Sequence, residues 1–101
     1  MRKRTTKEEA SQMLRDVPHE HSFWVNGGSQ VRNLYDLAMA LEEMNDGTYV
    51  FHVNSEKNDF GNWLMDVVND HKLAKDMGIA MNRGSAARKV RNRIGLLKGM
   101  L

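Results

Sequence analysis

Hydrophobic residues in the first segment of the chain repeat at helical spacing. The members of this apolar stripe are Ala10, Met13, Leu14 and Val17. The spacing predicts a helix over residues 5–17. Thr6 and Glu9 stand three residues apart and predict a capping box at its start, and Pro18 is expected to end it.

A second stripe has the same period and predicts the clearest helix of the chain. Its apolar members are Leu34, Leu37, Ala38, Leu41 and Met44. Asn33 is placed to cap the first turn, where Asp36 also favours the positive end of the helix dipole. Residues 45–47, Asn-Asp-Gly, are expected to end this helix.

Other segments are rich in β-branched and aromatic residues, which is typical of strands. Residues 21–25 and 30–32 flank Asn-Gly-Gly at 26–28, which tolerates positive φ and predicts a hairpin. Residues 48–53, Thr-Tyr-Val-Phe-His-Val, predict another strand. We therefore expect an α+β fold, with a small antiparallel sheet of about three strands covered by helices.

Helical spacing returns in the second half of the chain. Asn58 or Asp59 is suited to cap a helix that carries Phe60 and Trp63 one turn apart. The apolar phase slips near residues 69–70, which predicts a break.

After that break, Asp70 is expected to cap a short further helix that ends near Gly78. Residues 82–85 predict a loop, and the basic segment 83–101 carries an amphipathic helix from residue 86 onward. The expected order is helix, two strands, helix, strand and three helices, in one domain of 101 residues.

Charge is segregated along the chain, although the net charge is only +2. Residues 1–7 and 79–101 hold ten basic groups and no acid, so residues 8–78 carry five basic groups against all thirteen acids. Residues 1–5 are expected to form a flexible basic segment. The basic ends either fold back on the acidic body or reach an anionic partner.

Composition excludes several classes of protein. The chain has no cysteine, so it has neither a disulfide framework nor thiolate chemistry. The basic residues at the start are not followed by an apolar stretch, and no window approaches the ~18 apolar residues of a membrane span. These features favour a cytoplasmic protein without a membrane span.

The middle of the chain resembles a known family. The matching positions are Tyr49–His52, Asn58–Phe60, Trp63, Asp70 and Leu73–Ala74. An aromatic strand ending in histidine, followed by Asn-Asp-Phe-x-x-Trp, resembles an uncharacterised prokaryotic domain of unknown function over residues 22–77. The resemblance implies a shared fold and brings no activity with it.

His52 is the main candidate for chemistry. With Asp59 it would form an acid–base pair, and with His71 it would contribute to a metal site. The sequence offers no nucleophile motif and no Gly-rich phosphate loop, so a structural role is favoured. The residues expected to fasten the strand to the following helix are His52, Asn58, Asp59, Phe60 and Trp63. We expect no enzyme activity, no cofactor and no small-molecule substrate.

His19 and His21 stand two residues apart and share a face if the backbone is extended. Metal sites usually need three or four ligands, and the remaining ligands would have to come from distant residues. A polar loop after Pro18 is favoured over a metal site.

The chain has eight methionines, which either fill the core or form an adaptable binding surface. The methionines considered are Met13, Met44, Met65, Met77, Met81 and Met100. Core filling is favoured because Met13 and Met44 lie on helical stripes. Trp24 is expected to be exposed if Phe23 and Val25 face inward, and an exposed tryptophan is typical of an interface.

The leading functional hypothesis is a non-enzymatic module that binds a protein partner or a second copy of itself. Its surface would combine Trp24 with the apolar face of the last helix. That face consists of Val90, Ile94 and Leu97. The simpler interpretation packs this face on the chain's own core.

The alternative is a nucleic-acid-binding protein that grips phosphates with its basic ends. The candidate phosphate contacts are Arg88, Lys89, Arg91, Arg93 and Lys98. No aromatic residue is interleaved with these charges, so base stacking is not supported, and the acidic body would repel DNA at short range.

Overall fold

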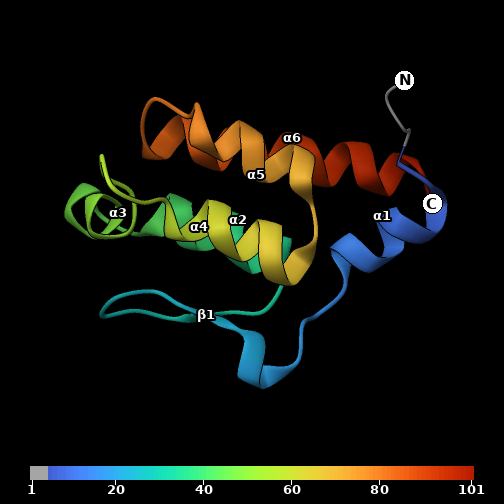
Figure 1. Ribbon diagram of the computed structural model, residues 1–101, viewed down its shortest axis with the longest axis horizontal. Helices are drawn as coiled ribbons and strands as arrows, with labels where there is room; N and C mark the ends of the chain where they lie inside the picture. The colour runs from blue at the N-terminus through green and yellow to red at the C-terminus, as the bar shows by residue number, and fades with distance from the viewer. Residues whose placement is uncertain (1–4) are drawn as a thin grey trace.

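The computed structural model describes residues 5–101 and shows a mainly helical domain with one short hairpin (Figure 1). These residues form six α-helices, labelled α1 to α6, and two strands, β1 and β2. The radius of gyration is 12.9 Å, as expected for a compact chain of this length. Of the predicted flexible segment 1–5, residues 1–4 lie outside the described residues.

Helix α1 (Lys7–Leu14) begins where the sequence predicts. The hydroxyl of Thr6 accepts the Glu9 N–H at 3.1 Å, and the Glu9 carboxylate accepts the Thr6 N–H at 2.8 Å, which completes the capping box. The helix ends before Val17, whose N–H donates to the Arg32 carbonyl at 2.8 Å. Val17 therefore belongs to the contact with the hairpin, and a 3₁₀ turn (His19–His21) follows it.

The predicted hairpin is confirmed, although its strands are short. Strand β1 (Phe23–Trp24) pairs antiparallel with β2 (Gln30–Val31), and Gly27 in the turn takes φ 70°, which glycine adopts without strain. Phe23 and Val31 are buried and Trp24 is exposed, so one face of the hairpin packs on the helices.

Helix α2 (Leu34–Glu43) is also confirmed, with the Asn33 side chain accepting the Asp36 N–H at 2.7 Å. Its long partner is α6 (Arg83–Gly99), and these two helices make the most extensive contact in the fold. The α6 residues buried in this core include Ala86, Ala87, Val90, Ile94 and Leu97. The predicted loop at 82–85 is wrong, because Asn82 caps α6 and the helix starts at residue 83.

The predicted third strand at 48–53 is also wrong. These residues belong to α3 (Asp46–His52), and the sheet of the described chain is the two-stranded hairpin alone. Asn45, assigned to the end of the preceding helix, is instead the N-cap of α3: its side chain accepts the Thr48 N–H at 2.8 Å. Tyr49 and His52 are three residues apart, so a helix places them on the same face, and both are buried. A strand would have placed them on opposite faces.

The predicted helix after residue 58 and the predicted break near residue 69 are both confirmed. Helix α4 (Asp59–Trp63) is capped by Asn58 and runs into a π-helical turn (Leu64–Val68). Asn69 then takes a left-handed conformation with φ 65°, which asparagine tolerates better than most residues. Asp70 caps α5 (His71–Gly78), as predicted.

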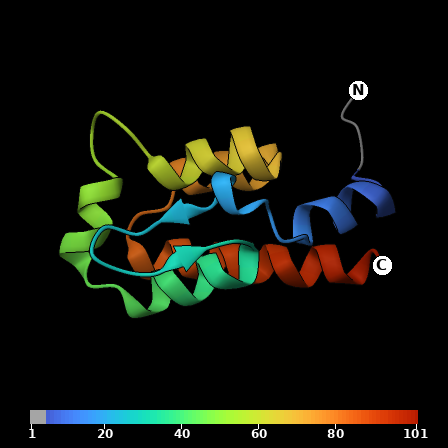
Figure 2. The ribbon, with the colours of Figure 1, turned by 90° about the horizontal axis from the view of Figure 1, so that it is seen from below.

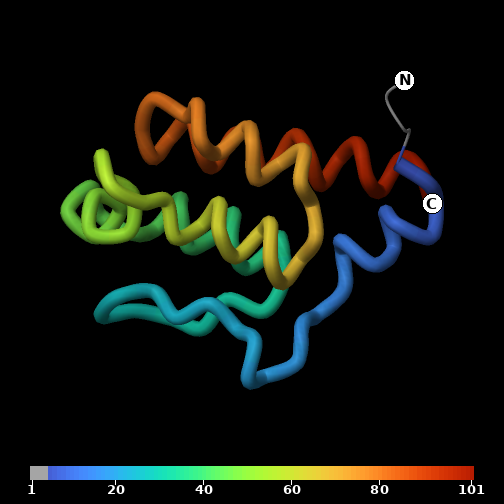
Figure 3. The backbone as a smooth tube through the Cα atoms, in the orientation of Figure 1, coloured from blue at the N-terminus to red at the C-terminus, as the bar shows by residue number. Residues whose placement is uncertain are grey.

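The elements are arranged in three levels. Helices α5 and α6 lie on one side of α2 and α4, and the hairpin lies on the other (Figures 1 and 3). Seen from below, the hairpin lies over the helices, and its strands run in about the same direction as α2 and α4 (Figure 2). Helix α3 and the α5–α6 connection lie at the end of the molecule opposite the chain terminus at residue 101 (Figure 1). No helix in the described part of the chain combines the length and the hydrophobicity needed to cross a membrane.

Candidate functional site

His52 joins the hairpin turn to the start of α4. Its Nε2 accepts the Asn26 N–H at 3.0 Å, which places the ring proton on Nδ1. The Nδ1–H then donates to the Asp59 carboxylate, also at 3.0 Å, and Lys57 donates to the same carboxylate oxygen at 2.9 Å. Both nitrogens of this buried ring are therefore committed to the fold.

The electrostatics of Asp59 fit a structural role. Burial alone would raise the pKa of Asp59, but hydrogen bonds from Lys57 and His52 and the positive charge of Lys57 outweigh it, so the pKa lies below its ordinary value of 3.8. A carboxylate that stays ionised and is bonded on one side to a committed histidine is a poor general base at neutral pH.

Aromatic packing holds the same region together. Phe23 of β1 stacks on Phe60 of α4 at 4.9 Å between ring centroids, and Trp63 meets Phe23 edge-on. The indole N–H of Trp63 donates to the His21 carbonyl at 2.8 Å. The structure thus brings together the predicted fastening residues, but they join a hairpin and a helix to α4 rather than a strand to α4.

The other histidines do not converge on His52. His19 lies beside Trp24 at 5.9 Å between ring centroids, and its Nδ1 is 3.0 Å from the Gln30 amide. His71 is the first residue of α5, remote in sequence from both. Residues 5–101 contain no group of three or more histidine, aspartate and glutamate side chains placed to hold a metal ion.

The apolar face assigned to a partner in the last helix lies in this chain's own core. Val90 and Leu97 are fully buried and Ile94 is nearly so. This outcome corresponds to the simpler interpretation of the amphipathic pattern, and it leaves these three side chains unavailable to a partner in this fold. Trp24, by contrast, is 57% exposed, with Phe23 and Val25 buried as predicted.

The basic residues of α6 divide into two groups. Arg91 forms a two-pronged pair with Glu42 at 2.8 and 2.9 Å, and Arg83 pairs with Asp46 and donates to main-chain carbonyls at the end of α2. The helix thus folds back on the acidic body. The candidate phosphate contacts without an ion pair among the described residues are Arg88, Lys89 and Lys98.

Arg93 makes the most deeply buried ion pair among residues 5–101. It donates to both carboxylate oxygens of Asp70 at 2.8 and 3.0 Å, and Asp70 also caps α5 by accepting the Leu73 N–H at 3.1 Å. Asp70 is fully buried and Arg93 nearly so. Because Asp70 and Arg93 neutralise each other, we assign the pair a structural role, in which it holds α5 to α6.

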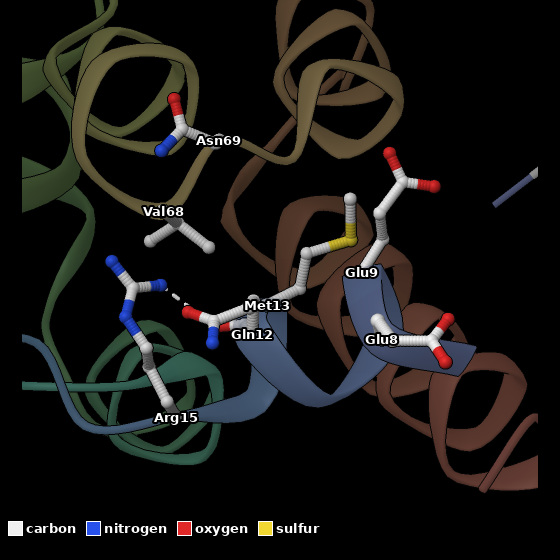
Figure 4. Close-up of a pocket in the computed structure, with 7 residues that line it drawn as sticks. All are labelled: Glu8, Glu9, Gln12, Met13, Arg15, Val68 and Asn69. Carbon is white, nitrogen blue, oxygen red and sulfur yellow. Dashed lines mark hydrogen bonds between the residues drawn. The ribbon is translucent and has the colours of Figure 1, made fainter. Parts of the chain in front are cut away.

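A groove of about 290 Å³ lies near this pair, between α1 and the π-helical turn (Figure 4). The residues that line it are Glu8, Glu9, Gln12, Met13, Arg15, Val68 and Asn69. In Figure 4 the two glutamates lie at one end and Arg15 at the other. Arg15 donates to the carbonyls of Gln12 and Val67, at 2.7 and 3.4 Å. Its guanidinium therefore ties α1 to the π-helical turn.

A different surface was missed by the sequence interpretation. A depression of about 330 Å³ separates α3 from the α5–α6 connection. Its apolar lining, which we call the α3-end patch, consists of Tyr49, Val50, Val53, Ala80 and Met81. Met81 is 91% exposed and Val50 is 58% exposed. The polar residues at the depression are Asp46, Asn82 and Arg83.

One signal in the sequence marks this patch. Ile79, Ala80 and Met81 form an apolar run between Gly78 and the cap residue Asn82, in a connection where polar residues are the rule. The methionines are found both in the core and on the surface: Met77 is in the core, whereas Met81 faces solvent.

Tyr49 gives the depression an unusual feature. The side chain is only 7% exposed, and its hydroxyl finds no hydrogen-bond partner among residues 5–101. Burial raises the pKa of Tyr49 above its ordinary value of 10.0. Buried polar groups are nearly always hydrogen-bonded. The unpaired Tyr49 hydroxyl is therefore an exception, and it lies beside exposed apolar residues.

No family model, curated protein or solved structure matches the chain, so the resemblance to an uncharacterised prokaryotic domain stays a prediction.

Proposed function

We propose that the chain is a non-enzymatic protein-interaction module that binds its partner through the α3-end patch. The observation that carries the proposal is the exposure of Val50 and Met81 beside a depression with a mainly apolar lining. Large aliphatic side chains that are exposed together lose free energy on leaving water, which favours association.

Two further observations support an interaction role over catalysis. The ring nitrogens of His52 are both engaged in contacts that hold the fold together. The ion pairs of Arg91 and Arg93 are likewise internal. Val50 and Met81, by contrast, are exposed apolar side chains that the core does not cover.

Trp24 is the second candidate contact, because its ring remains exposed. It lies on the hairpin, whereas the α3-end patch lies on α3 and the α5–α6 connection. We assign it a secondary role because no depression among those described adjoins it.

Phosphate binding is the weaker alternative. Of its five proposed cations, Arg91 and Arg93 are neutralised by acids of the same chain. The remaining three would make a small electrostatic contact, and its affinity would fall steeply with salt. A mobility-shift titration at low salt tests it directly.

The proposal is tested by affinity capture from cells of the organism that encodes the chain, with the full-length protein as bait. Val50→Ser combined with Met81→Ser removes the apolar surface without disturbing a buried side chain. We expect wild type to retain a specific protein and the double variant to lose it by about tenfold or more. Sedimentation velocity of the same proteins detects a second copy as the partner.

Leu96→Ser is the matched control, because Leu96 is also an exposed aliphatic residue but lies on α6. It should behave as wild type in both measurements. Equal retention by the double variant, or a monomeric wild-type chain that captures nothing, would contradict the proposal.

A further inference from the structure

The depression beside α3 is small for a binding site. Its volume of about 330 Å³ lies at the lower end of the ~300–1,000 Å³ range of small-molecule pockets. Its walls come from two places, the helix α3 and the α5–α6 connection. Both sides contribute apolar residues: Val50 of α3 and Val53 just after it, and Ala80 and Met81 of the connection. Such a space fits one large aliphatic side chain.

The charges at the depression favour a neutral occupant. Asp46 and Arg83 pair with each other at 3.2 Å, and Arg83 also donates to the carbonyls of Leu41 and Glu42. The remaining polar group is Asn82, whose carbonyl oxygen caps α6 by accepting the Ser85 N–H at 2.8 Å. Neither a net positive nor a net negative charge is therefore left to attract an ion.

Two hydrogen-bond donors at the depression remain unused. The hydroxyl of Tyr49 is buried and unpaired among residues 5–101, and the amide N–H₂ of Asn82 likewise has no partner there. A hydroxyl donor that is held away from water gives up little when it meets an acceptor, so its bond contributes more than an exchange with solvent would. An occupant that carries a carbonyl oxygen would satisfy it.

We propose that the depression receives one aliphatic side chain of a partner polypeptide, and that Tyr49 donates a hydrogen bond to a backbone carbonyl of the same segment. This inference rests on the proposed function and names the chemistry of the partner. Because the hydroxyl is covered in the free chain, binding includes a rotamer change of the lining side chains. Met81 suits that change, being unbranched and almost fully exposed.

A small molecule with both features is N-acetyl-leucine methylamide, which carries an isobutyl side chain and two neutral amides. It is titrated into the full-length chain and followed by the methyl resonance of Met81 and the amide resonances of α3. We expect saturable shifts confined to the α3-end patch, with little dependence on salt because no charge is involved. N-acetyl-alanine methylamide, which has a methyl group in place of the isobutyl group, should bind at least several-fold more weakly.

Tyr49→Phe isolates the hydroxyl, since it keeps the ring that packs on Phe60. The dissociation constant of the leucine probe should rise by about tenfold in Tyr49→Phe. Tyr35→Phe, which changes an exposed tyrosine of α2, should leave it unchanged. Equal affinity of wild type and Tyr49→Phe would overturn the assigned hydrogen bond, and absent shifts, or shifts outside the patch, would overturn the pocket.

These outcomes are distinct from failure of the proposed function. A chain that captures a partner through Val50 and Met81, yet binds the leucine probe equally well with and without the Tyr49 hydroxyl, keeps the interaction role and loses the hydrogen bond assigned to it. A chain that binds the probe but captures neither a partner nor a second copy keeps the pocket and loses the interaction role.

Discussion

The Asp70–Arg93 pair and the Tyr49 hydroxyl are both buried polar features, but they differ in how well they are satisfied. Arg93 donates twice to Asp70, which also caps α5, so this charge pair has strong internal bonds. Tyr49 has none among residues 5–101. The paired groups stabilise the fold, whereas the unpaired hydroxyl beside an apolar depression is the group that we propose for contact with a partner.

The largest expected loss of stability comes from breaking the Asp70–Arg93 pair. Arg93→Met leaves Asp70 as a buried charge without its partner and should lower the free energy of unfolding by about 3–5 kcal/mol. Urea denaturation measures this loss. Arg88→Met, on the exposed part of the same helix, should change the free energy of unfolding by less than about 0.5 kcal/mol.

A second substitution sharpens this test. Asp70→Asn in the Arg93→Met background removes the stranded charge and keeps an asparagine at the α5 cap, where this residue is favoured. The double variant should recover at least about half of the lost stability, since replacing a buried pair costs much less than breaking it. A double variant as unstable as Arg93→Met would show that the guanidinium stabilises the fold by packing instead.

The next effect concerns the histidine that joins the hairpin to α4. His52→Phe keeps an aromatic ring against Phe23 and Phe60 but removes both hydrogen bonds, and should lower the free energy of unfolding by about 2–3 kcal/mol. Thermal unfolding measures the change, and His71→Phe, at an exposed position, is the control. If His52→Phe were as stable as wild type, the two hydrogen bonds would contribute nothing to the fold.

A smaller effect appears in acid. Because the pKa of Asp59 is lowered in the fold, its carboxylate stabilises the protein above about pH 3.8, and this contribution is lost as the pH falls through the folded pKa. Asp59→Asn should therefore flatten the acid limb of the stability profile measured by urea denaturation at several pH values. Asp66→Asn, an exposed acid, should leave that limb as in wild type, and identical profiles for Asp59→Asn and wild type would contradict the assignment.

The sequence predicts the helix caps correctly, because a cap depends on a few neighbouring residues. Asn33, Asn58 and Asp70 each cap the helix that the sequence assigns to them. Trp24 is exposed for an equally local reason, since its two neighbours face inward.

The sequence does not predict the helix at residues 46–52. Its β-branched and aromatic residues favour a strand, but the Asn45 cap and the burial of Tyr49 and His52 on one side make a helix. The α3-end patch exists only when this segment is a helix, so a sequence interpretation that expects a strand does not predict the patch. The Asp70–Arg93 pair was missed because it joins residues 23 positions apart, a distance at which no periodic pattern links them.

The account depends most on the Tyr49 hydroxyl, which has no hydrogen-bond partner among residues 5–101. Tyr49→Phe tests it most directly in urea denaturation of the full-length chain, with Tyr35→Phe as the matched control. The free energy of unfolding of Tyr49→Phe should equal that of wild type or exceed it by up to about 1 kcal/mol, because an unpaired buried hydroxyl stabilises nothing. A loss of about 1 kcal/mol or more, absent in Tyr35→Phe, would show that the hydroxyl is already bonded and would contradict the claim.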